Sequence, residues 1–252
     1  MIAIGKLDIG RRRQKNEDSI FVSNTRIGPL PNLYIVADGM GGHNAGDVAS
    51  QLAVEEFCNY LKLHDESNLD KEEEILLFMK TSILHANHIV YQLSLEDSNL
   101  QGMGTTFSAC SAINNKLYIV HVGDTRIYLV NKNGIRQATT DHSYVQEMLS
   151  RGYISSSEVN EHPKRNVITR AIGTYNKVKI DTFMYDLEEV EYVLLCSDGL
   201  TSMLSDEDIY KIIYSKEGLL EEIADELIWH ANSRGGNDNI AVVIGMNKEV
   251  IK

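Results

Sequence analysis

The chain alternates between short apolar runs and longer stretches in which apolar residues recur at every third or fourth position. Short runs rich in β-branched and aromatic residues are typical of buried strands. They predict strands over 2–8, 19–24, 33–37, 104–113, 116–122, 125–131, 178–185, 190–197 and 239–246. Asn114-Asn115 predicts a two-residue hairpin turn, because asparagine tolerates a positive φ.

Spacing of three and four residues predicts helices with one apolar face. These helices are expected over 45–63, 71–95, 143–151, 206–214 and 217–232. Ser143 and Gln146 have the spacing of a capping box at the start of the third one. Residues 152–172 are polar and weakly periodic, so we expect an irregular insertion there.

The order of these elements indicates the fold class. Strands come in runs and helices come in pairs, which favours an α+β fold with antiparallel sheets and helices packed outside them. Only three prolines occur, and no stretch rich in glycine and serine suggests a linker. We therefore expect one domain over residues 1–247 and a short C-terminal tail over 248–252.

The balance of charges limits the classes of partner. Lys and Arg number 24 against 36 Asp and Glu, which gives a formal net charge of −12. A chain this acidic is a poor general binder of nucleic acid or of an anionic membrane, so neither is expected as a partner. Solubility and a cation site explain the acidity equally well.

Three cysteines and the N-terminus bear on the compartment. Cys58, Cys110 and Cys196 are scattered in apolar contexts, which predicts reduced core residues. No stretch is apolar for long enough to span a bilayer, and the first residues do not form a signal peptide. A cytoplasmic location is therefore expected.

Two aspartates directly follow apolar runs, and each precedes a glycine. Asp38-Gly39 follows residues 33–37, and Asp198-Gly199 follows residues 192–196. A carboxylate at the end of a buried strand, next to a residue without a side chain, suits a place where backbone and ligand come close. The acidic residues at strand ends or beside glycine or asparagine are Asp8, Glu17, Asp18, Asp38, Asp124, Asp198 and Asp238.

Several carboxylates cannot share a buried site as bare anions, because desolvation and mutual repulsion cost too much. Either some of them are protonated or metal ions neutralise them. Oxygen ligands select hard cations, so Mg²⁺ or Mn²⁺ is expected before Zn²⁺. The eight histidines show no zinc-binding spacing. Taken singly, each aspartate is more often a turn or cap residue, so the hypothesis depends on the whole set.

These carboxylates belong to a longer ordered series of motifs. The series is Asp8-x-Gly10-x-x-Arg13-x-x-Asn16-Glu17-Asp18, Asp38-Gly39-Met40-Gly41-Gly42-His43, Gly46-Asp47, Gly102-x-Gly104-Thr105-Thr106, Val122-Gly123-Asp124-Thr125-Arg126, Asp141-His142-Ser143, Thr169-Arg170-Ala171-Ile172-Gly173, Ser197-Asp198-Gly199-Leu200 and Asp238-Asn239. Over nearly its whole length, the chain resembles the metal-dependent Ser/Thr protein phosphatases of the protein phosphatase 2C (PPM) family, in their compact bacterial form.

The resemblance implies a four-layer α-β-β-α sandwich of two antiparallel sheets flanked by helix pairs. It implies a flap segment over about 142–172 beside a metal site between the sheets. Asp38 would bridge two Mn²⁺ or Mg²⁺ ions, and Asp198 with Asp238 would complete the first ion's ligands. Asp124 would join Asp198 in binding a third, weaker ion.

The resemblance assigns the remaining site residues as well. Glu17 and the carbonyl of Gly39 would hold the second ion together with waters, and Asp18 would support those waters. Arg13 matches the phosphate-binding arginine, and a guanidinium suits a tetrahedral oxyanion. Its neighbours Arg11 and Arg12 are expected to be solvated.

The implied reaction is attack of a metal-bound hydroxide on phosphoserine or phosphothreonine, without a covalent enzyme intermediate. Two metal ions can lower the pKa of a shared water and clamp both oxygens of an in-line displacement. No arginine stands six residues after any cysteine, as a cysteine phosphatase would need, and no Gly-x-Ser-x-Gly motif occurs. The expected partners are phosphorylated proteins and an opposing bacterial Ser/Thr kinase in signalling, with the chain a monomer.

One position departs from the animal members of the family, which carry the histidine taken as general acid where this chain has Met40. Methionine cannot donate a proton, so a metal-bound water or His43 would supply it. A capping role of His43 at the 45–63 helix is an equal alternative. His142 is expected to be structural. The flap segment, which contains Arg151, His162, Lys164 and Arg165, is where we expect substrate choice to be encoded.

Two alternative functions are compatible with parts of this sequence. A regulator that dephosphorylates an anti-sigma antagonist shares the implied fold, but it usually carries a sensor or membrane domain. A pseudophosphatase would bind phosphoproteins without turnover and would typically lack metal ligands. The carboxylates Glu17, Asp38, Asp198 and Asp238 are all present, which argues against this second alternative.

Overall fold

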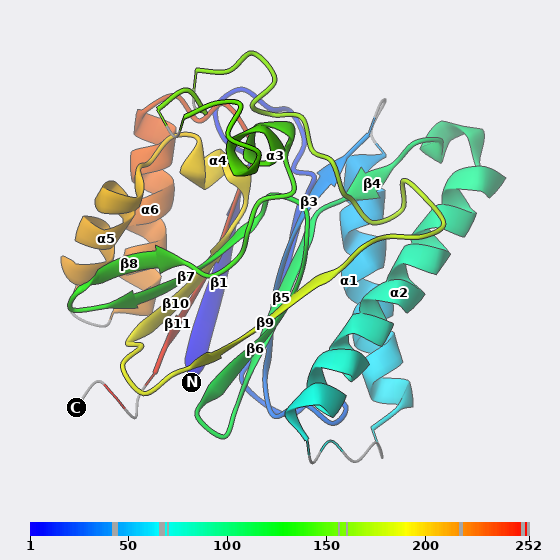
Figure 1. Ribbon diagram of the computed structural model, residues 1–252, viewed down its shortest axis with the longest axis horizontal. Coiled ribbons are helices and arrows are strands. Elements are labelled where there is room, and N and C mark those ends of the chain that lie inside the picture. Colours follow the sequence, from blue (N-terminus) through cyan, green and yellow to red (C-terminus); the bar gives the residue numbers. More distant parts are fainter. Residues whose placement is uncertain are drawn as a thin grey trace.

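A computed structural model describes residues 1–41, 45–65, 69, 71–155, 157–159, 161–216, 219–247 and 250. Within these residues, two antiparallel sheets face each other and helices cover both outer faces (Figure 1). The predicted α+β class and the four-layer α-β-β-α sandwich are therefore confirmed. The predicted tail over 248–252 lies, apart from Val250, outside the described residues.

The described strands form a five-stranded and a six-stranded sheet, and neighbouring strands within each sheet pair antiparallel. The first sheet has the order β1 (Ile2–Asp8), β11 (Ile240–Met246), β10 (Tyr192–Cys196), β7 (Arg126–Asn131) and β8 (Gly134–Gln137). The second has the order β2 (Asp18–Ser23), β3 (Leu33–Met40), β5 (Phe107–Ile113), β6 (Lys116–Val122) and β9 (Asp181–Asp186), with the short β4 (Gly104–Thr105) beside β3.

Two pairs of helices cover the outer faces of the sheets, as Figure 1 shows. The helices α1 (Gly46–Leu63) and α2 (Glu72–Glu96) lie on the second sheet, and α5 (Asp206–Tyr214) and α6 (Leu220–Ser233) lie on the first. A turn of 3₁₀ helix, Ser98–Leu100, follows α2. The short helices α3 (Tyr144–Ser150) and α4 (Asp198–Thr201) lie at one edge of the sandwich.

Buried apolar side chains of the described residues gather in three layers. Along β3, Tyr34 and Val36 point between the two sheets, whereas Leu33, Ile35 and Ala37 point towards α1 and α2. This alternation follows from the period of two in a strand, and it explains why a strand buried on both faces reads as one apolar run. The third layer lies between the first sheet and helices α4, α5 and α6.

Several local predictions agree with the structure. Asn114 and Asn115 have φ angles of 48° and 61°, so they form the expected hairpin turn between β5 and β6. Ser143 caps α3, because its Oγ accepts a hydrogen bond from the Gln146 N–H at 3.3 Å. The cysteines are buried and free, and no described helix has the length and apolarity to cross a membrane.

The structure differs from the predicted elements most clearly in the following places. The strand expected over 104–113 is interrupted at Thr106, whose backbone and hydroxyl bond Asp38 instead. The strand expected from residue 178 begins at Asp181. Strand β8 and helix α4 were not predicted, because β8 contains a single large apolar residue and α4 is only four residues long.

The α1 helix offers a matched test of the packing. Leu61 is fully buried, whereas Leu63 is 78% exposed. Replacing Leu61 with alanine leaves a cavity and should lower the free energy of unfolding by about 2–5 kcal/mol. Leu63→Ala should change it by less than about 0.5 kcal/mol. Urea unfolding of both variants measures the difference, and equal effects would contradict this packing of α1.

Candidate active site

The antiparallel strand order brings the acidic residues to one edge of the sandwich. Asp18, at the start of β2, stands directly opposite Asp38, near the end of β3. The end of β10 lies beside β7 and β11, so Asp198, two residues after β10, lies near the segment before β11 that carries Asp238. Asp124 follows β6 in the turn to β7. This edge, with α3 and α4, is at the top of Figure 1.

A cleft of about 560 Å³ opens at this edge. Its lining includes the predicted site residues Arg13, Asp124, Asp198 and Asp238. One further part of the lining comes from the segment that begins with α4, and another comes from the flap segment (142–172). The flap residues in the lining are Ser143, Val145, Gln146, Val159, Arg165 and Asn166. The cleft is therefore bounded by carboxylates from the sheet edge and by a wall from the flap segment.

The buried aspartates at this edge, of which Asp124 and Asp198 line the cleft, are electrostatically strained. Burial raises the pKa of Asp18 to about 7 and the pKa of Asp124 to about 8. Burial also raises the pKa of Asp198 to about 6; the charge of Asp238 adds to this, and a hydrogen bond with Asp38 opposes it. Burial and the charges of the neighbouring aspartates raise the pKa of Asp38 well above its ordinary value. These carboxyl groups are fully ionised at neutral pH only if positive charge is added.

Arg13 supplies one positive charge within the described site. Its Nη2 donates to Asp238 Oδ2 at 2.7 Å, and its side chain is 46% exposed. The hydrogen bond to Asp238, which outweighs partial burial, raises the pKa of Arg13, and the charges of Glu17 and Asp38 add to it. Arg13 is therefore held at the cleft by an anion but keeps access to solvent.

Asn239 fixes the loop that carries Arg13 and Glu17. Its Nδ2 donates to the carbonyl oxygens of Ile9 and Lys15, both at 2.9 Å. Its Oδ1 accepts from the Glu17 N–H at 2.9 Å. Ser197 has a similar role for Asp18, because its Oγ donates to Asp18 Oδ2 at 2.7 Å. The sequence motifs included both polar residues, but nothing in their spacing revealed these roles.

Two glycines let the Glu17 carboxylate and the Gly39 carbonyl approach each other. A Cβ atom at Gly46 would lie 2.8 Å from Glu17 Oε1 and 2.8 Å from the Gly39 carbonyl oxygen. A Cβ atom at Gly39 would lie 2.0 Å from the Gly46 carbonyl oxygen. A side chain at Gly46 would therefore displace the Glu17 carboxylate and the Gly39 carbonyl, and a side chain at Gly39 would displace the Gly46 carbonyl. Carboxylate and carbonyl oxygens are the donors that Mg²⁺ and Mn²⁺ accept.

A buried oxygen without a partner gives a further reason to expect a cation. Among the described side chains, Asp124 Oδ1 is buried and accepts no hydrogen bond. A carboxylate oxygen removed from water without a donor is costly, and a metal ion would compensate that cost. The donor set of this edge, which consists of oxygens only, fits a hard cation.

The carboxylates surround the cleft without closing on a single point. Within the described ranges, no three His, Cys, Asp or Glu side chains form a group that could already hold a metal ion. Bare carboxylates repel one another, and Arg13 and Ser197 engage Asp238 and Asp18 instead. The structure thus gathers the predicted ligands at one edge but does not show a formed coordination shell.

The remaining predicted residues lie in different places. His43 falls outside the described residues. Met40 ends β3 and pairs with Gly104 of β4. Of the four flap residues singled out, Arg165 lines the cleft, whereas Arg151 pairs with Glu147 at 3.9 Å. The other two, Lys164 and His162, lie against the ring of Tyr144.

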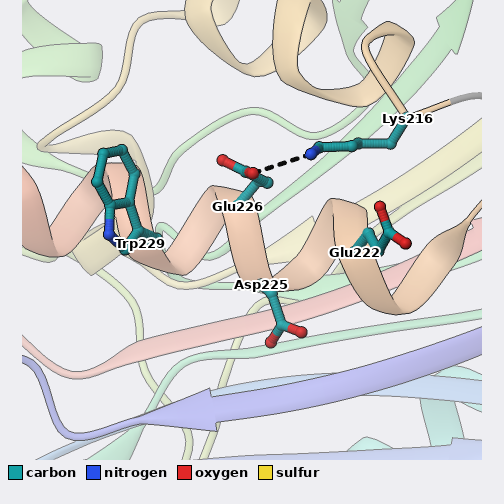
Figure 2. Close-up of a pocket in the computed structure, with 5 residues that line it drawn as sticks. All are labelled: Lys216, Glu222, Asp225, Glu226 and Trp229. Atoms are coloured by element: carbon teal, nitrogen blue, oxygen red, sulfur yellow. Dashed lines mark ion pairs between the residues drawn. The ribbon is translucent and has the colours of Figure 1, made fainter.

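A second hollow, of about 370 Å³, lies on the outer face of α6 (Figure 2). Its lining residues are Lys216, Glu222, Asp225, Glu226 and Trp229. Lys216 pairs with Glu226 at 2.9 Å, and Asp225 pairs with Lys6 at 2.5 Å. None of the predicted site residues lines this hollow, and two of its three carboxylates are already paired, so it is not the catalytic cleft.

Comparison with known proteins identifies the class of the chain. A family model described as protein phosphatase 2C matches residues 10–237. The serine/threonine phosphatase stp of Listeria monocytogenes is 40% identical over 239 residues, which cover 95% of this chain and 93% of the relative. The protein phosphatase PhpP of Streptococcus pneumoniae is 35% identical over 243 residues, with 96% of each chain covered.

A solved structure gives the same result. The serine/threonine phosphatase Stp1 from Staphylococcus aureus matches with a TM-score of 0.90 and 32% identity, over 98% of this chain and 96% of that chain. The chain belongs to the protein phosphatase 2C family, whose members are phosphoprotein phosphatases that depend on metal ions.

The raised pKa of Asp124 predicts how stability depends on pH. Its pKa is about 8 in the folded chain and about 4 in the unfolded chain. Between these pH values the folded chain therefore binds more protons than the unfolded chain. The free energy of unfolding consequently falls as the pH rises. In a chelator at pH 8, Asp124→Asn should raise the midpoint of thermal unfolding by roughly 2–4 °C. At pH 5 the gain should vanish.

The control for this measurement is Asp186→Asn at the exposed end of β9, where the side chain is 76% accessible. This variant should show no gain that depends on pH. If Asp124→Asn is no more stable than the unmodified chain at pH 8, Asp124 does not carry a strained negative charge.

Proposed function

We propose that this chain hydrolyses phosphoserine and phosphothreonine in proteins and uses two Mn²⁺ or Mg²⁺ ions at the cleft. The observation that carries the proposal is the gathering of Asp38, Asp124, Asp198 and Asp238 beside Arg13 at one edge of a protein phosphatase 2C fold. Relatives described as serine/threonine phosphatases support the substrate class.

We assign the ligands by likeness to the family. Burial and the charges of Asp18, Asp124, Asp198 and Asp238 all act on Asp38, which supports our proposal that Asp38 contacts both ions. Asp198 and Asp238 would complete the ligands of one ion. Asp124, whose Oδ1 has no hydrogen-bond partner, is suited to a third, weaker ion beside Asp198.

The second ion would be held on the other side of Asp38. Glu17 Oε1 and the Gly39 carbonyl oxygen both face the space beside Gly46, which supports their assignment as its ligands. Asp18, held by Ser197, would orient waters there. Such ions, when bound, neutralise the phosphate and make water a better nucleophile at neutral pH.

Arg13 would orient the phosphate group. Its guanidinium stays charged at every working pH and can donate two parallel hydrogen bonds to phosphate oxygens. Because its side chain is partly exposed and bound to a single carboxylate, it can exchange Asp238 for a substrate. The leaving serine or threonine oxygen also needs a proton, for which we propose His43 or a water of the cleft, because Met40 cannot donate one.

We further propose that residues 1–247 form one domain and that the chain acts as a monomer in the cytoplasm. There the chain would oppose a bacterial Ser/Thr kinase in signalling. These points rest on the family likeness of the whole chain. The rival hypothesis of a pseudophosphatase is weakened, because Glu17, Asp38, Asp198 and Asp238 all lie at the same edge.

The central test is hydrolysis of p-nitrophenyl phosphate and of a phosphothreonine peptide by chain stripped of metal. Activity should appear with added Mn²⁺ and disappear with a chelator. Asp38→Asn and Asp198→Asn should each lower kcat/KM by about 100-fold or more, because each removes a ligand charge at the reacting phosphate. Asp225→Asn, in the hollow on α6, is the matched control and should leave activity unchanged. Normal activity in either cleft variant would refute the assignment.

A second test distinguishes direct phosphate binding by Arg13 from general electrostatic attraction by the neighbouring arginines. Arg13→Ala should raise KM for the phosphothreonine peptide roughly tenfold or more, since it removes hydrogen bonds from a charged donor. Arg12→Ala, at the exposed neighbouring position, should leave KM within about twofold. Steady-state kinetics at fixed ionic strength measures both. Equal effects of the two substitutions would show that Arg13 acts only through the local field.

A further inference from the structure

The flap segment begins at His142. Both the backbone and the imidazole ring of His142 form hydrogen bonds with the turn that carries Asp124. The His142 N–H donates to the Gly123 carbonyl oxygen at 2.7 Å. The Gly123 N–H donates to His142 Nδ1 at 3.0 Å. Because Nδ1 is an acceptor, the neutral ring carries its proton on Nε2, and burial lowers the pKa of His142, which favours this neutral form.

His142 Nε2 donates to Asp181 at the first position of β9. The distance to Asp181 Oδ2 is 3.1 Å. Arg170, near the far end of the flap segment, donates from Nη1 to the other oxygen, Asp181 Oδ1, at 2.9 Å. One carboxylate therefore binds both ends of the flap segment. Asp181 is itself fixed in the sheet, because it pairs with His121 of β6.

The backbone at the far end of the flap segment is linked to Asp38 by a second set of contacts. The Thr169 N–H donates to the His142 carbonyl oxygen at 2.8 Å, which closes the base of the flap segment. Ile172 exchanges two backbone hydrogen bonds with Thr105, at 2.8 and 3.0 Å. Thr105 Oγ1 in turn donates to the Asp38 carbonyl oxygen at 2.9 Å. The two ends thus lead to the backbone at Asp124 and at Asp38.

The contacts that hold the two ends of the flap segment together also position the wall of the cleft. Ser143 follows His142 directly and caps α3, whose residues Val145 and Gln146 line the cleft. The preceding residue, Asp141, is held by Arg126, whose Nε donates to Asp141 Oδ1 at 3.1 Å and whose Nη2 donates to Asp141 Oδ2 at 2.6 Å. The position of α3 relative to Asp124 is therefore set by contacts within three consecutive residues.

We propose that His142, Asp181 and Arg170 form a latch that fixes the flap segment against the Asp124 turn and so positions the cleft wall that a phosphoprotein contacts. This inference rests on the proposed phosphatase function for its substrate, but its structural part concerns the chain alone. The three are positioning residues: Asp181 and Arg170 do not line the cleft, and His142 acts through Gly123.

The latch predicts a coupling between two segments far apart in the sequence. Without the Asp181 carboxylate, the His142 ring loses the acceptor that orients it, and Arg170 loses its anion. Both the flap segment and the turn at 122–126 should then open more readily. A residue that served only general stability would instead affect the whole chain through a lower free energy of unfolding.

Amide hydrogen exchange on the full chain in a chelator tests this coupling without any phosphatase activity. In Asp181→Ala, amides of 143–170 and of 122–126 should both exchange about tenfold faster or more, since hydrogen bonds to a charged group are lost. Asp186→Ala, at the exposed end of the same strand, should leave both segments unchanged. Arg170→Gln removes the other side of the latch and should reproduce the pattern. Faster exchange in the flap segment alone, or in neither segment, would overturn the proposal.

Kinetics with Mn²⁺ provides the functional readout. Asp181→Ala should raise KM for a phosphothreonine peptide about tenfold and leave KM for p-nitrophenyl phosphate within about twofold, because only the peptide contacts the wall. Equal losses on both substrates would overturn the positioning role. An unmodified chain that is inactive on both would refute the proposed function, while the exchange result would still decide the latch.

Discussion

Electrostatic repulsion among carboxylates at one edge of the sandwich is the constraint on which the structure depends. Asp18 and Asp38 stand opposite each other across β2 and β3, and the pKa values of both are raised. Such an arrangement is unfavourable in isolation, because charges of one sign are held together away from water. The apolar layers on both faces of each sheet fix the strand ends and so hold these carboxylates close together. Positive charge from Arg13 and, in our account, from metal ions offsets the remaining repulsion.

The edge and the flap segment have different mechanical roles. The carboxylates come from strand ends and are fixed by short contacts such as Ser197 to Asp18 and Thr106 to Asp38. The wall of the cleft comes from an irregular insertion, which is free to differ in shape between relatives. The latch at Asp181 would let this insertion vary while its two ends remain in register with the carboxylates. Chemistry and substrate choice would then be encoded in separate parts of one domain.

Much of the fold could be predicted because most strands are buried on both faces and read as apolar runs. The prediction failed where this signal is weak: β8 is a polar edge strand, and α4 begins at Asp198-Gly199, where glycine disfavours a helix. The acidic residues of the site were found from their positions at strand ends and from the ordered motifs. The roles of Ser197, Asn239 and Asp181 could not be found, since each depends on contacts between segments distant in the sequence.

In our interpretation, these carboxylates form one site for hard cations. Titration of the metal-free chain with Mn²⁺, with free Mn²⁺ counted by electron paramagnetic resonance, tests it most directly. We expect at least two bound ions for the unmodified chain and for Asp225→Asn, and a loss of bound ions in Asp38→Asn, the residue proposed to bridge them. Unchanged Mn²⁺ binding in Asp38→Asn, or no binding by the folded unmodified chain, would contradict it.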